Sequence, residues 1–154
     1  MFNGDYMFRE SILGPWELVS CVGESREGDS FLPYGEQPVG KLIYTEGGHL
    51  AVVLMNSARS PFASEDISKA TIEEAAAAFN TFDAYAGRWN LDPDTGRIEH
   101  TIECGRMPNW VGKTHTRFSS VQDEELTLST EEFSMAGKMW QVHVRWRRAS
   151  NWRY

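Results

Sequence analysis

Residues 39–55, VGKLIYTEGGHLAVVLM, contain two apolar segments separated by a pair of glycines. Like most of the chain, both segments fit a period of two residues, which is typical of a β-strand with one buried face. Gly47 and Gly48 can adopt the positive φ that a tight turn requires. The stretch therefore predicts a β-hairpin with strands at Val39–Tyr44 and His49–Met55.

The same period, interrupted by turn-forming residues, predicts six further strands. The segment Asp92-Pro-Asp-Thr-Gly96 combines proline, aspartate and glycine, each of which favours a turn for its own physical reason. It is expected to join two strands in a second hairpin. With the hairpin above, the predicted strand count is eight, and the further strands are expected at Trp16–Val22, Phe82–Leu91, Arg97–Cys104, Thr114–Ser120, Glu125–Thr130 and Met139–Arg148.

One segment departs from the strand pattern. Thr71 is followed three residues later by Glu74 and then by four alanines. This is the sequence of a capping box ahead of residues with high helix propensity. It predicts a short helix ending at Phe79, which either caps or flanks an end of the sheet structure or, as an alternative, presents a surface to a cofactor.

Eight antiparallel strands can form a sandwich or a closed barrel. The predicted connections are mostly short hairpins, which favour an up-and-down barrel because a Greek key needs long crossovers. The interior of an eight-stranded barrel holds packed side chains or one small ligand. The expected fold is all-β, an eight-stranded antiparallel up-and-down barrel with one short helix insertion, in a single domain over residues 1–154.

Charge and composition restrict the partners. The formal net charge of −7 argues against nucleic acid, which needs a positive protein face. Asp5, Arg9 and Glu10 interrupt the N-terminal segment, so we expect neither a signal peptide nor a membrane partner, and a cytoplasmic location. Cys21 and Cys104 lack CxxC spacing, which favours reduced, packed thiols and leaves a disulfide open.

Several stretches between Leu13 and Arg148 match the sequence pattern of a known family. Gly14-Pro15-Trp16 has the GxW form that marks the first strand of lipocalins. The other matching stretches are LPYGEQPVGKLIYT (32–45), EEAAAAF (73–79), YAGRW (85–89), IEHTIE (98–103), PNWVG (108–112), LTLST (126–130) and VRWRR (144–148).

Together these stretches resemble the lipocalin-like domain family of bacteria and fungi, from Leu13 to Arg148. The resemblance implies a compact lipocalin-type barrel. In such a barrel Trp16 closes one end against an arginine near the last strand, here Arg147, since a guanidinium can stack on an indole face. Relatives also occur beside natural-product pathways, which favours a small hydrophobic metabolite as the partner. The chain departs from the family at Thr101, where many relatives have a second histidine, and at Trp89, where they have tyrosine.

Strand alternation places several candidate catalytic residues on one face. His100 alternates with Ile98 and Ile102, so its imidazole is expected to point inward. It then serves either as a hydrogen-bonded core residue or as an acid/base near neutral pH. Asp83 and Tyr85 alternate together on the preceding strand and are expected to meet His100, although Tyr85 also suits a core aromatic.

Arg117 is the fourth candidate catalytic residue. Alternation sets it opposite Phe118, and an inward Phe118 would expose it, yet the resemblance singles out an arginine at this position. An inward Arg117 needs an anion or carbonyl oxygens as partners, because an unpaired buried charge is costly. It would then either stabilise an enolate on a ligand or pair with an acidic side chain such as Asp83.

Aromatic residues supply the candidate ligand-binding walls. Trp110 lies in the turn Pro108–Gly112, between two predicted strands, where it is either a plug that completes the core or a lid at the entrance. The expected ligand-binding residues are Tyr44, Trp89, Asn109, Trp110 and Trp146. The four histidines lack HExxH or HxH spacing, so we expect no metal, and no cofactor-binding motif is present.

Three function classes follow. The leading hypothesis is a barrel that binds one small hydrophobic metabolite and rearranges it without a cofactor, as an isomerase, cyclase or dehydratase, with His100 as acid/base, Tyr85 as donor and Arg117 as electrostatic stabiliser. The alternative is a carrier with the same pocket and no turnover. The third is an interaction module with a filled barrel. Whether the chain forms a homodimer is left open by the sequence.

Overall fold

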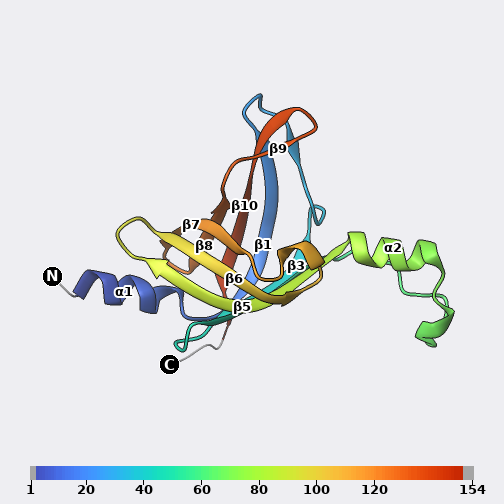
Figure 1. Ribbon diagram of the computed structural model, residues 1–154, viewed down its shortest axis with the longest axis horizontal. Coiled ribbons are helices and arrows are strands. Elements are labelled where there is room, and N and C mark those ends of the chain that lie inside the picture. The colour runs from blue at the N-terminus through green and yellow to red at the C-terminus, as the bar shows by residue number, and fades with distance from the viewer. Residues whose placement is uncertain (1–2, 151–154) are drawn as a thin grey trace.

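The computed structural model describes residues 3–150, and strands account for most of them (Figure 1). Helices α1 and α2 lie at opposite ends of the long axis, with the strands between them. The elements in chain order are α1 (Asn3–Ile12), β1 (Gly14–Ser25), β2 (Ser30–Phe31), β3 (Pro38–Tyr44), β4 (His49–Asn56), η1 (Ile67–Lys69), α2 (Ile72–Asn80), β5 (Phe82–Asp92), β6 (Arg97–Gly105), η2 (Pro108–Trp110), β7 (Thr114–Gln122), β8 (Glu125–Thr130), β9 (Phe133–Met135) and β10 (Lys138–Arg148).

Eight of the strands close into an antiparallel barrel in the order β1, β3, β4, β5, β6, β7, β8, β10, and β10 pairs back with β1. The prediction of an all-β, eight-stranded antiparallel barrel is confirmed. Two short strands were not expected: β2 pairs with β1, and β9 pairs with β10. They extend the ends of the two strands that close the barrel.

The hairpin at residues 39–55 forms as β3 and β4. Tyr44 pairs with Leu50, and burial alternates strictly along β3. Gly48 has a φ of 78°, and its N–H donates to the Thr45 carbonyl at 3.1 Å. The glycine is needed here because a side chain rarely adopts this conformation.

Two β-bulges change which residues face the interior. In β1 the register shifts between Leu18 and Ser20, so Cys21 is buried. Unbroken alternation over the strand expected at Trp16–Val22 would set Val22 on the face of Trp16, and that expectation is wrong. In β6 the register shifts opposite the step from Ala86 to Gly87, and Cys104 is exposed. The expectation that Cys104 is packed is therefore wrong, because the extra residue of a bulge reverses the alternation beyond it.

One end of the barrel is closed around Trp16, which has none of its surface exposed. Its indole N–H donates to the Ile12 carbonyl at 2.9 Å, which ties it to the end of α1. The guanidinium carbon of Arg148 lies 3.9 Å from the centre of the Trp16 ring. The expected partner, Arg147, is exposed instead, because Arg148 is the residue that shares the inward face of Trp146.

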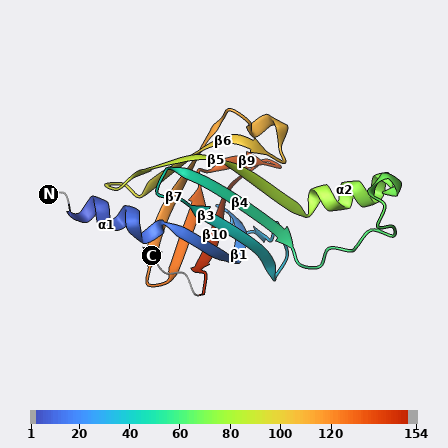
Figure 2. The ribbon, with the colours of Figure 1, turned by 90° about the horizontal axis from the view of Figure 1, so that it is seen from below.

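Helix α2 begins with the predicted capping box between Thr71 and Glu74. It projects away from the barrel and buries none of its residues, so it neither caps nor covers a barrel end (Figures 1 and 2). Its C-terminal end is tied to the barrel by Arg106, which donates to the Phe79 carbonyl at 2.8 Å. No helix within residues 3–150 combines the length and the apolar character needed to cross a bilayer.

Candidate functional site

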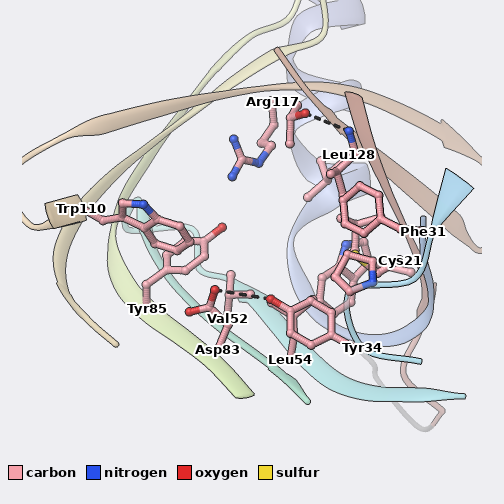
Figure 3. Close-up of a pocket in the computed structure, with 15 residues that line it drawn as sticks. Cys21, Phe31, Tyr34, Val52, Leu54, Asp83, Tyr85, Trp110, Arg117 and Leu128 are labelled. Atoms are coloured by element: carbon pink, nitrogen blue, oxygen red, sulfur yellow. Dashed lines mark hydrogen bonds between the residues drawn. The ribbon is translucent and has the colours of Figure 1, made fainter. Parts of the chain in front are cut away.

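The barrel interior contains a cavity of about 280 Å³ (Figure 3). Its lining comes from β1, β2, β4, β5, β7, β8 and β10, together with the segment before β3 and helix η2. Its wall is mainly apolar and includes Phe31, Val52, Leu54, Leu128, Val144 and Trp146. The interior is therefore not packed shut, which argues against an interaction module with a filled barrel.

The cavity brings together some of the residues expected from the sequence. Those that line it are Asp83, Tyr85, Trp110, Arg117 and Trp146. Tyr44, Trp89 and His100 lie in the buried core and are not among the lining residues of the described chain. Asn109 is exposed in η2. The split arises because inward-facing residues near one end of a barrel pack against each other, while those farther along leave space.

His100 lies between two tyrosine hydroxyls and has none of its surface exposed. Its Nε2 is 2.7 Å from the Tyr44 hydroxyl, and its Nδ1 is 3.0 Å from the Tyr85 hydroxyl. The three side chains come from β6, β3 and β5. Since Tyr85 lines the cavity, the three residues form a hydrogen-bonded chain that runs from the core to the cavity wall.

Burial determines the charge state of this chain. It lowers the pKa of His100 to about 3, with further contributions from the positive charge of Arg117 and from His115. Burial also raises the pKa of Tyr44 well above its usual value, and raises that of Tyr85 despite the opposing effect of Arg117. All three groups are consequently neutral at neutral pH.

Arg117 lies on β7 with its guanidinium directed into the cavity, on the side of the Tyr85 hydroxyl (Figure 3). Its Nη1 donates to the Thr116 carbonyl at 2.8 Å. Phe118 is 45% exposed, so of the two orientations considered from the sequence, Arg117 takes the inward one. The suggested partner Asp83 is held by another arginine.

That arginine is Arg106, which follows β6. Its Nε lies 3.3 Å from Asp83 Oδ1, and its Nη2 donates to Oδ2 at 3.4 Å. The Tyr34 hydroxyl also donates to Asp83 Oδ2 at 3.4 Å. Asp83 is only 4% exposed, so these contacts supply the partners that a buried carboxylate requires.

Trp110 forms part of the cavity wall from helix η2. Its ring meets the His115 ring edge-on at 5.1 Å between centroids, and the Tyr85 ring at 6.1 Å. The indole is partly buried and packs on the core cluster. This position accounts for a tryptophan in a turn: it covers the cavity between β6 and β7.

Sequence reasoning missed several cavity residues. Tyr34 and Pro33 lie within the stretch LPYGE, where no strand pattern marks them as inward-facing, and Cys21 faces inward only because of the β1 bulge. Arg106, which does not line the cavity but pairs with Asp83, stands beyond the last alternating residue of β6. The family-like stretch LPYGEQPVGKLIYT was the one available signal for Tyr34.

Other chemistry has little support at this site. No three histidine, cysteine or acidic side chains within the described residues converge as metal ligands. Burial raises the pKa of Cys21 to about 12, so its thiol is protonated and unreactive as a nucleophile at neutral pH. The cavity therefore offers aromatic walls, neutral hydroxyls, one matched ion pair and one inward arginine.

Comparison with known proteins agrees with this arrangement. A family model for a lipocalin-like domain matches residues 13–149. A protein of Aspergillus oryzae, the 4'-hydroxy-3'-methoxypropiophenone carrier protein ppsC, is 34% identical over 73 residues. That match covers 43% of this chain and spans 65% of the length of the carrier protein. By its barrel and its match over residues 13–149, the chain belongs to the lipocalin-like domain family.

Proposed function

We propose that this protein is a carrier that holds one small hydrophobic metabolite inside its barrel. The observation that carries the proposal is the cavity of about 280 Å³ with mainly apolar walls. Its volume lies near the lower end of small-molecule sites, which span roughly 300–1,000 Å³. A compact ligand, such as the aryl ketone named for the similar Aspergillus oryzae carrier, is of suitable size.

Binding is favoured over turnover by the position of His100. The imidazole has no exposed surface, and its pKa of about 3 keeps it neutral. A general acid or base must reach the proton that it transfers, and Tyr85 lies between His100 and the cavity. The leading catalytic hypothesis from the sequence is therefore the weaker candidate.

The carrier proposal can be tested with 5-fluorotryptophan-labelled protein and the ligand 4'-hydroxy-3'-methoxypropiophenone. Trp110→Phe assigns the Trp110 resonance in the ¹⁹F spectrum. Ligand is expected to shift the signal of Trp110, which lines the cavity, and to leave that of Trp16 in place. Mass spectrometry should recover the ligand unchanged. Equal shifts at Trp16 and Trp110, or no shift at either, would contradict the proposal.

A second candidate is a cofactor-independent isomerase, cyclase or dehydratase. The observation that favours it is the chain from Tyr44 through His100 to Tyr85, which can orient a proton at the cavity wall. In this candidate Tyr85 contacts the substrate, His100 acts through it, and Arg117 stabilises an enolate. Asp83 positions Arg106 and Tyr34 at the rim of the cavity.

The second candidate predicts a large effect of His100→Gln on turnover. Glutamine keeps hydrogen bonding but cannot relay a proton, so the folded variant should lose roughly 10²–10⁴-fold in rate. Ligand binding, measured by calorimetry on the same preparation, should persist. A folded variant with undiminished turnover would reject the relay.

A further inference from the structure

The cavity contains an arginine whose charge no protein carboxylate balances. Arg117 forms no ion pair within residues 3–150, and the groups that its guanidinium meets, the Thr116 carbonyl and the Tyr85 hydroxyl, are both neutral. Asp83, which lines the same cavity, is engaged by Arg106 and Tyr34. A charge in an apolar enclosure needs an opposite charge to offset its lost hydration.

The neutral His100 makes Tyr85 a donor toward the cavity. A neutral imidazole has one N–H and one acceptor nitrogen. Within the described residues, the buried Tyr44 hydroxyl has His100 as its partner, so its O–H must donate to Nε2 or stay unsatisfied. Nδ1–H then donates to the Tyr85 oxygen, 3.0 Å away. The Tyr85 O–H is left free to donate to an occupant of the cavity.

A further donor lies in the same wall. Among the buried side-chain nitrogen and oxygen atoms of the described residues, Trp146 Nε1 is the one without a hydrogen-bond partner. Trp146 lines the cavity together with Arg117 and Tyr85, but its Nε1 has almost no accessible surface. The polar groups that the wall offers directly to an occupant, the Arg117 guanidinium and the Tyr85 hydroxyl, are thus hydrogen-bond donors, and one of them is cationic. An occupant that matches them supplies acceptor oxygens and a negative charge.

We infer that the ligand carries an acidic oxygen, as a phenol, an enol or a carboxylic acid, and that it binds as the anion against Arg117 with the Tyr85 hydroxyl as a second donor. The inference rests on the proposed function, since it names the class of ligand for the same cavity. Arg117 selects the charge, Tyr85 is a contact residue, and Tyr44 and His100 are positioning residues that fix the direction of its O–H. The apolar walls hold the rest of the molecule.

Two probes of nearly equal shape distinguish the effect of the ligand's charge on binding from the effect of its shape. 4-Nitrophenol has an acidic oxygen whose anion absorbs in the visible, whereas 4-nitroanisole is its neutral ether. At a pH above the pKa of 4-nitrophenol, calorimetry with the wild type is expected to show that 4-nitrophenol binds more tightly than 4-nitroanisole. Arg117→Met should weaken the binding of 4-nitrophenol by roughly 10- to 100-fold, as expected for the loss of a hydrogen bond to a charged group. The affinity for 4-nitroanisole should be unchanged.

Absorbance gives a second readout, the pKa of the bound phenol. An adjacent guanidinium favours the phenolate, so bound 4-nitrophenol should ionise at lower pH in the wild type than in Arg117→Met. Arg117→Lys retains the positive charge, so the pKa of bound 4-nitrophenol in this variant should lie between those in the wild type and in Arg117→Met. Arg88→Met removes an exposed arginine from the outer face of β5 and serves as the matched control, with wild-type behaviour expected.

Folding of the variant is checked on the ligand-free protein. Because Arg117→Met removes a charge without an acidic partner, its melting temperature should equal or exceed that of the wild type. A fall of more than about 5 °C would show that the charge is already compensated in the empty protein and would overturn the inference.

Binding outcomes separate the inference from the carrier proposal. If both probes bind and Arg117→Met affects them equally, the acidic-ligand inference is overturned and the carrier proposal stands. The same holds if only the ether binds. If neither probe binds the wild type, both are overturned.

Discussion

Trp16 is the residue on which the closed end of the barrel depends. It is fully buried, donates to α1 through its indole N–H and stacks against Arg148 of the last strand. The contact with Arg148 joins segments that are distant in sequence, and the hydrogen bond to Ile12 joins β1 to the helix that precedes it. A large aromatic residue at this point therefore holds the first strand, the last strand and the N-terminal helix together.

Trp16→Ala is expected to lower the free energy of unfolding by about 3–5 kcal/mol, the range for truncation of a buried tryptophan. Chemical denaturation monitored by circular dichroism measures the change. Trp110→Ala is the control, and because its indole is only partly buried it should cost less. Equal losses for the two variants would contradict the packing described for Trp16.

The depressed pKa of His100 predicts a dependence of stability on pH. In the unfolded chain the histidine takes up a proton near pH 6.5, but in the folded barrel only near pH 3. Between these values the unfolded state binds more protons, so the free energy of unfolding should fall as pH decreases, by up to about 1.4 kcal/mol per pH unit from this residue.

His100→Gln should remove this contribution. Its free energy of unfolding is expected to fall less steeply than that of the wild type between about pH 6.5 and 3, while the two differ by a constant above pH 7.5. Carboxylates titrate in both proteins, so their contributions cancel in the difference. Parallel curves over the whole range would show that His100 is not held neutral by burial.

Individual side chains were predictable where alternation is regular. The inward positions of His100, Asp83 and Tyr85 follow from the period of two in β5 and β6. The same rule identifies Arg148 rather than Arg147 as the partner of Trp16, because position 148 has the parity of Trp146. The ion pair between Asp83 and Arg106 was not predictable, since it depends on where the chain leads after β6.

At the scale of elements, the bulges decide which surfaces of the strands meet the cavity. A bulge is one extra residue, and in β1 no glycine or proline marks the step between Leu18 and Ser20. The hairpin at residues 39–55 was predictable because its glycines indicate a tight turn and the segments on both sides alternate as strands do. The cap of helix α2 was predictable but its direction was not, because the helix buries no residue in the core that could orient it.

Gly87 marks the second bulge, and the close approach of two backbones there predicts intolerance of any side chain. A Cβ at this position would lie 2.0 Å from the Thr101 carbonyl oxygen. Gly87→Ala is expected to cost at least about 1–3 kcal/mol of stability, the range for overpacking, since backbone atoms cannot move aside cheaply.

Gly47→Ala provides the matched control. A Cβ at Gly47 would have its nearest neighbour at 3.8 Å, an ordinary contact with His49, and its stability should change by about 0.5 kcal/mol or less. Thermal and denaturant unfolding of the two variants measure the contrast. If Gly87→Ala were as stable as Gly47→Ala, the bulge would not be as tight as described.

Helices η1 and α2 carry exposed apolar side chains that could take part in assembly. Ile72 of α2 is 84% exposed and Ile67 of η1 is 80% exposed, so neither side chain stabilises the single chain by burial. The homodimer that the sequence left open stays a prediction. Sedimentation of the wild type beside an Ile67→Ser/Ile72→Ser variant tests it, with a dimer predicted for the wild type at high concentration.

At the scale of the whole molecule, the barrel encloses apolar space and controls the polar groups that face it. Closure between β1 and β10 removes exposed strand edges along the barrel, and η2 and the segment around Tyr34 complete the cavity wall. The closed barrel could be predicted from eight alternating strands with short connections. The cavity could not, because its volume depends on how all the inward side chains pack together.

The measurement that tests the carrier proposal most directly is calorimetric titration of the cavity-blocked protein with 4-nitroanisole. Val144→Phe places a larger ring on a side chain that lines the cavity, and Val53→Phe makes the same change on the exposed face of β4. Both substitutions suit a strand, so both variants should fold. The account predicts one ligand per chain for the wild type and Val53→Phe, and at least tenfold weaker binding for Val144→Phe. Equal affinity in all three folded proteins would place the ligand outside the barrel and contradict the proposal.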